Sequence, residues 1–153
     1  MATKNKFTRQ EMVAAALRVV RTKGIDGLIA KTLAAALGTS TQPIFTAFGS
    51  MDAVRQEVYA AALRIYDEYA QAGLREEIPF FGVGKQYLRF ARERPELYRL
   101  LFLSSVREHV GMESMRWSKE RVRPTLRAVY HLTDEEADRY SGTSGSWCTA
   151  WPR

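Results

Sequence analysis

The chain has 153 residues, 46% of them hydrophobic and 26% charged, which is the size and composition of a single globular unit with a substantial core. No apolar run approaches the roughly 18–20 residues that a membrane span needs, and the single cysteine, Cys148, excludes an internal disulfide. The net charge of +6 is unevenly distributed along the chain, because residues 1–50 carry seven basic and two acidic side chains.

This distribution favours a polyanion as the partner of the N-terminal part, with a merely solubilising basic surface as the alternative. The polar start of the chain has no apolar stretch of signal-peptide type behind it. We therefore expect a cytoplasmic protein with no membrane partner.

Apolar residues recur at helical spacing along the whole chain, which predicts an all-α fold. The first helix should begin after Thr8, since Thr8 and Glu11 have the spacing of a capping box, and should end at Gly24. A second helix is predicted over residues 30–37, stopped by Gly38.

A third, very short helix is predicted over about 41–47, and Ser50 is placed to cap a fourth over about 51–72. The fourth helix is apolar on two sides, which is typical of a helix packed between two other structures. It should therefore join the basic N-terminal part to the rest of the chain.

The remaining residues predict further helices, over about 80–93, 95–106 and 112–131, and a last one from about 134. The helix over 80–93 has two apolar rows, of which one contains Phe81, Gly84 and Leu88. The last helix is opened by a second capping box, Thr133 with Glu136.

The second and third predicted helices have the spacing of a helix-turn-helix. Two short helices that cross steeply need a small residue at the crossing, here Ala34, a sharp turn, here Gly38, and an inward aliphatic residue, here Ile44. The start of the third helix would then face DNA bases, where Gln42 is suited to a bidentate contact with adenine and Thr41 to a base edge or thymine methyl.

The stretch "FTRQEMVAAALRVVRTKGIDGLIAKTLAAALGTSTQPIFTAFGSMDAV", residues 7–54, resembles the DNA-binding part of the TetR (tetracycline-repressor-like) family of bacterial transcriptional regulators. The segment "FARERPELYRLLF", residues 90–102, also looks like the body of many such regulators. The resemblance implies an all-helical homodimer that reads a palindrome in double-stranded DNA and is released by a small-molecule effector. It implies a DNA-binding domain over 1–49 and a regulatory and dimerisation domain over 50–153.

The resemblance assigns Lys31 and Thr32 to phosphate and groove contacts, and it places Ser40, Thr41, Gln42, Pro43 and Phe45 on the recognition helix. The family commonly has a tyrosine where Phe45 stands and a lysine where Met51 stands, so two phosphate contacts are lost. We expect the basic arm Lys4, Lys6 and Arg9 to compensate for them.

The C-terminal end departs further from the family, whose members usually continue for about forty residues through two helices of the dimer interface. "SGTSGSW" is a poor helix, and the closing "WPR" resembles nothing in the family. We expect a truncated or altered end. The alternative function is therefore a helical interaction module that pairs with a full-length relative and does not bind the operator itself.

Aromatic residues of the body are the candidates for an effector pocket: Tyr66, Phe81, Tyr87, Phe90, Phe102 and Trp117. A plain core is the alternative for each of them. One cysteine and two histidines make no convincing metal site, and we expect no cofactor. A thiol enzyme using Cys148 with His109 is the remaining alternative, which lacks any accompanying oxyanion feature, so we predict that the protein is not an enzyme.

Overall fold

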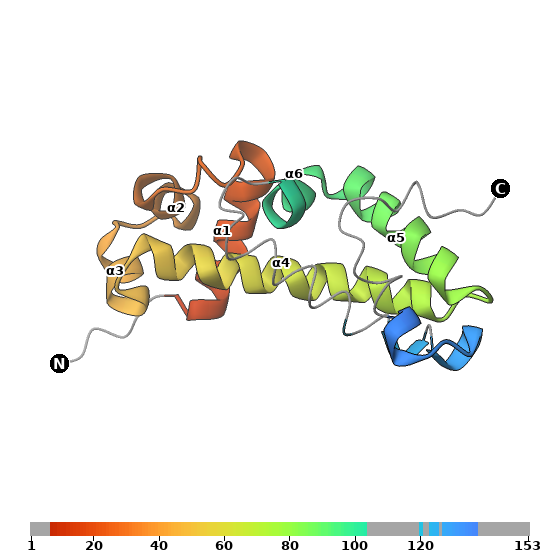
Figure 1. Cartoon of the computed structure of the whole chain (residues 1–153). Coiled ribbons are helices and arrows are strands. Elements are labelled where there is room, and N and C mark those ends of the chain that lie inside the picture. Colours follow the sequence, from red (N-terminus) through yellow and green to blue (C-terminus); the bar gives the residue numbers. More distant parts are fainter. Residues whose placement is uncertain (1–6, 104–119, 121–122, 126, 138–153) are drawn as a thin grey trace.

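The computed structural model describes residues 7–103, 120, 123–125 and 127–137 (Figure 1). Its elements are α1 Arg9–Lys23, α2 Ala30–Leu37, α3 Gln42–Phe48, α4 Met51–Leu74, α5 Pro79–Glu93, α6 Pro95–Tyr98 and the π-helix η1 Arg99–Leu103. Residues 120, 123–125, 127–130 and 134–137 are also helical. All regular structure in the described residues is helical, which confirms the all-α prediction for that part of the chain. None of the helices described is long and apolar enough to cross a membrane.

Helix α1 begins and ends as predicted. The Thr8 hydroxyl accepts a hydrogen bond from the Glu11 amide at 3.2 Å, and the Glu11 carboxylate accepts one from the Thr8 amide at 2.7 Å. These bonds from Thr8 lower the pKa of the Glu11 carboxyl below its ordinary value of 4.5. Gly24 ends the helix at φ 71°, a backbone conformation that other residues rarely adopt.

Helix α2 has the predicted bounds because Gly38 adopts the left-handed conformation, with φ 65° and ψ 38°. The amides of Gly38 and Thr39 donate to the carbonyls of Ala35 and Ala34, at 3.2 and 3.0 Å, which is a Schellman motif. Helix α3 follows after four residues, one residue later at each end than predicted. Its first turn contains Pro43, whose fixed φ suits that position.

Helix α4 runs the length of the molecule (Figure 1). The Ser50 hydroxyl caps it by accepting from the Ala53 amide at 3.1 Å, and its 24 residues span about 36 Å. Helices α1 and α3 pack on its N-terminal part and α5 packs on its C-terminal part. The largest buried cluster is continuous along it, from Met12 of α1 to Leu101 of η1.

Helices α4 and α5 approach each other at two glycines. A Cβ added to Gly73 would lie 2.6 Å from the backbone of Gly82 and Val83, and one added to Gly82 would overlap the Gly73 carbonyl oxygen. Glycine is therefore needed at both positions for the two backbones to pack this closely.

Of the two apolar rows predicted on α5, only one faces the core. Val83 and Phe90 are buried, whereas Phe81 and Leu88 are 62% and 67% exposed. The pattern could not separate the rows, since both have helical spacing. The helix predicted over 95–106 is divided into α6 and η1 and is described only to Leu103.

The second capping box is confirmed. The Thr133 hydroxyl accepts from the Glu136 amide at 3.3 Å, and the Glu136 carboxylate accepts from the Thr133 amide at 2.9 Å. This turn carries Ala137, which is fully buried in a small cluster with Val83 of α5. The last described residues therefore pack on the same end of the molecule as α5.

Candidate functional site

Helix α3 is held on one side and exposed on the other. Ile44 is fully buried and Phe48 is 9% exposed, and both belong to the main core with Leu33 and Ala34 of α2. Gly38 turns the chain in the left-handed conformation, and Ala34 and Ile44 are both buried. Because two buried side chains fix so short a helix, its other side is presented rigidly to solvent.

Of the residues assigned to DNA contacts, Gln42, Pro43 and Phe45 lie on α3, whereas Ser40 and Thr41 precede it and Lys31 and Thr32 belong to α2. Lys31, Ser40, Gln42 and Phe45 are exposed, and Thr32, Thr41 and Pro43 are half-buried. Phe45 keeps 41% of its surface exposed. Lys6 lies outside the described residues.

The Thr32 hydroxyl is already used inside the protein. It donates to the carbonyl of Gly27 at 2.7 Å and accepts from the amide of Ile29 at 3.1 Å, so it secures the loop before α2. Ile29 itself is 46% exposed beside it. Thr32 thus positions the start of α2. Because a hydroxyl has only one proton to donate and Gly27 accepts it, Thr32 is a weak donor to a phosphate.

Arg9, which the sequence places in a DNA-contacting arm, also makes contacts within the protein. Its guanidinium donates to the Ala47 carbonyl at 3.3 Å and to the Glu57 carboxylate at 3.0 Å, and it lies 4.7 Å from the centre of the Phe48 ring. Arg9 therefore ties the C-terminal end of α3 to α1 and α4. Its partners are 38 and 48 residues away in the sequence, so no local pattern predicts them.

A second arginine, Arg55 of α4, makes bonds in the same region. Arg55 pairs with Asp52 at 2.8 Å and donates to the Leu28 carbonyl at 3.4 Å, across the loop before α2. By contrast, Lys31 has no ion pair within the described part of the chain. Of these basic side chains, Lys31 is thus the one whose charge is available to an external anion.

The candidate effector residues form a cluster of rings between α4, α5 and η1. Tyr66 meets the edges of Phe90 and Phe102 at centroid distances of 5.2 Å, and Tyr87 meets Phe102 at 5.3 Å. The Tyr87 and Tyr98 hydroxyls are 2.7 Å apart, and burial raises the pKa of Tyr87 above its ordinary value of 10.0.

Two predicted pocket residues do not belong to this cluster. Phe81 points to solvent from the outer row of α5, and Trp117 lies outside the described residues. The four remaining rings pack on each other, so in this conformation the cluster is a core and an effector would have to separate them.

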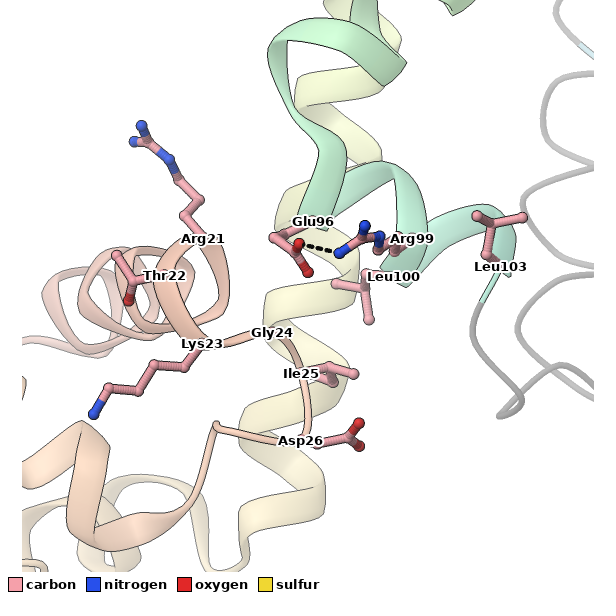
Figure 2. Close-up of a pocket in the computed structure, with 10 residues that line it drawn as sticks. All are labelled: Arg21, Thr22, Lys23, Gly24, Ile25, Asp26, Glu96, Arg99, Leu100 and Leu103. Carbon is pink, nitrogen blue, oxygen red and sulfur yellow. Dashed lines mark hydrogen bonds and ion pairs between the residues drawn. The ribbon is translucent and has the colours of Figure 1, made fainter.

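A cavity of about 570 Å³ lies elsewhere, at the junction of α1 with α6 and η1 (Figure 2). Its lining is mostly polar and comes from two segments: Arg21, Thr22, Lys23, Gly24, Ile25 and Asp26 on one side, and Glu96, Arg99, Leu100 and Leu103 on the other. Glu96 and Arg99 pair with each other, while Arg21 and Lys23 extend away from η1. These charges therefore do not converge on a common point, and no sequence pattern had indicated the cavity.

Comparisons with family models, curated proteins and solved structures find no match to this chain. The described residues also contain no group of three or more histidine, cysteine or acidic side chains able to hold a metal ion. The candidate site therefore stands on the residues of α2 and α3 themselves.

Proposed function

We propose that the protein is a sequence-specific DNA-binding transcriptional regulator in which α2 and α3 act as a helix-turn-helix. The observation that supports this most is the division of α3, in which Ile44 and Phe48 are buried while Gln42 and Phe45 are exposed. A rigid helix with an exposed, mostly uncharged side fits a major groove, where side chains read base edges. Membership of the TetR family is part of the same proposal.

Each exposed residue has a separate role in this proposal. Gln42 hydrogen-bonds a base edge, and Phe45 contributes apolar contact of the kind that a thymine methyl offers. Lys31 neutralises a phosphate and carries no sequence information. Arg9 and Arg55 hold the unit together through their bonds to Glu57 and Leu28.

The regulatory part of the proposal concerns the rings of the body. Helix α6 packs on both α1 and α5, and η1 packs on α4, so these two short elements connect the ring cluster to the N-terminal helices. An apolar or aromatic small molecule that separates Tyr66, Tyr87 and Phe102 would displace η1 and thereby α1. The proposed outcome is repression that the effector relieves, by a homodimer on a palindrome.

The test is selection from a randomised pool of double-stranded DNA at moderate salt, followed by binding assays on the enriched sequence. Enrichment of an inverted repeat supports the proposal, and an unenriched pool refutes it. Gln42→Ala should relax the preference at one base position and weaken binding by about 1–3 kcal/mol. Gln71→Ala, in the distant half of α4, is the matched control and should change nothing.

Lys31→Ala should weaken every sequence alike and reduce the slope of log affinity against log salt by about one. A change of base preference in this variant would contradict its assignment to phosphate. The same binding assay, repeated with candidate aromatic compounds, tests for the effector.

A further inference from the structure

The cavity at the junction of α1 with α6 and η1 has an apolar part as well as a polar one. Leu100 is buried in the main core and extends from η1 toward the loop of Ile25, whose side chain packs against the same core (Figure 2). Leu103, which also lines the cavity, is 55% exposed. The main core thus reaches the surface here. The cavity volume of about 570 Å³ lies within the range of small-molecule sites, roughly 300–1,000 Å³.

One wall of this cavity is a π-helix. Arg99, Leu100 and Leu103 of η1 line the cavity, and Phe102 of the same turn contacts Tyr66 in the ring cluster. Single π-helical turns are rare, and they occur frequently at functional sites. A ligand in the cavity would therefore contact the same unusual turn that meets the rings of the body.

The basic side chains around the cavity are turned away or already paired. Arg21 and Lys23, in the last turn of α1, extend away from η1, and Arg99 pairs with Glu96. They offer no common binding point for an anion. Asp26, by contrast, lines the cavity and has no ion pair within the part of the chain that the structure describes.

The end of α1 adds negative charge at the cavity. The C-terminal end of a helix carries a partial negative charge, and α1 ends at Gly24, which is part of the lining. The Glu96 carboxylate lies at the same place, because a Cβ added to Gly24 would be 3.5 Å from its Oε2 atom. Two carboxylates and a helix end thus share one guanidinium, that of Arg99, so the side of the cavity that faces η1 favours a cation.

We propose that this cavity binds a small organic cation, an amine whose ammonium group pairs with Asp26 and whose apolar body packs on Ile25, Leu100 and Leu103. Asp26 and Ile25 are neighbours in the loop after α1 and extend to the same side of it, so one ligand can contact both (Figure 2). The site is separate from the ring cluster, and its ligand is charged, unlike the apolar effector proposed above. The inference goes beyond the proposed function and does not depend on it, because its test uses no DNA.

The experiment is a titration of the full chain, labelled with nitrogen-15, with 4-phenylbutylamine, followed by NMR. The backbone amide signals of residues 24–26 and 99–103 should shift, whereas those of Tyr66, Tyr87 and Phe90 should not. The comparison ligand is 4-phenylbutan-1-ol, which has the same apolar body without the charge. It should bind about fivefold more weakly, because that is what a partly exposed ion pair contributes.

Three variants separate the charged contact from the apolar one. Asp26→Asn should make the amine and the alcohol bind alike, because it removes the charge and keeps the shape. Leu103→Ala should weaken both ligands by about threefold, since it removes apolar contact from both. The matched control is Glu77→Gln, which removes an exposed carboxylate at the opposite end of α5 from α6 and should change neither dissociation constant. Circular dichroism of each variant checks that the fold is intact.

Four results would overturn the proposal. If residues 24–26 and 99–103 do not shift at about 10 mM amine, the cavity is not a site for such ligands. Shifts confined to Tyr66, Tyr87 and Phe90 would place the ligand in the ring cluster. A preference for the amine that is absent in the wild type, or that survives Asp26→Asn, would exclude the contact with Asp26. Tighter binding of the anion 4-phenylbutyrate would show that the basic side chains determine the choice of ligand.

Discussion

Two glycines of α5, two residues apart, should respond oppositely to the same substitution. Gly84→Ala places a methyl group in open space, so it should stabilise the helix by about 0.5–1 kcal/mol. Gly82→Ala gains the same helix propensity, but its Cβ would overlap the Gly73 carbonyl oxygen and lie 2.9 Å from the Cβ of Glu76. Forcing apart two packed backbones costs about 1–3 kcal/mol.

Because the propensity gain is common to both variants, the difference between their unfolding free energies isolates the cost of the α4–α5 contact. We expect that difference to be about 1–3 kcal/mol, which corresponds to roughly 2–10 °C in Tm for a chain of this size. Gly84→Ala should unfold above the wild type and Gly82→Ala below it.

The assay is urea and thermal unfolding followed by circular dichroism, at two protein concentrations so that self-association is separated from stability. Equal stability of the two variants would refute the reasoning, since it would mean that α4 and α5 are not in backbone contact at Gly73. A destabilised Gly84→Ala at the lower concentration would show that the outer face of α5 is not open within the monomer.

Three further changes test contacts that position the candidate site. Arg9→Ala should destabilise the fold by only about 0.5–1 kcal/mol, because its ion pair with Glu57 is largely exposed. The variant should weaken DNA binding without changing the base preference, and an altered preference would show that Arg9 contacts the DNA. Ser50→Ala should cost about 1 kcal/mol in urea unfolding by removing the cap of α4, whereas Ser40→Ala should cost little, and equal losses would contradict the capping role. Because the pKa of the Glu11 carboxyl is lowered, its contribution to stability is present above pH 4.5 and is lost as the pH falls through the pKa of the folded state. Glu11→Gln should therefore flatten the acid side of a curve of Tm against pH. An unchanged acid side would show that the bonds with Thr8 do not persist in solution.

The helix ends were predictable from sequence because their causes are local. Thr8, Ser50 and Thr133 each cap through a hydrogen bond to a residue three positions away, and Gly38 stops α2 through its own backbone conformation. Such rules need only a few neighbouring residues, so the predicted bounds of α1 to α4 are correct to within about two residues.

Distant contacts were not predictable in the same way. The row of Phe81 and Leu88 has the same period as the buried row of Val83 and Phe90, and contacts between distant helices, among them the glycine contact between α4 and α5, decide which row faces inward. The role of Arg9 depends on partners in two later helices. The cavity at the junction likewise combines segments about seventy residues apart.

The division of α3 has a consequence for how such a protein changes over generations. The side chains that keep the helix in place, Ile44 and Phe48, are different from those that it presents, Gln42 and Phe45. A substitution at Gln42 leaves the buried side chains of the helix in place, so selection acts on this position more through what it touches than through folding. The exposed surface of this helix can therefore change while the rest of the protein stays as it is.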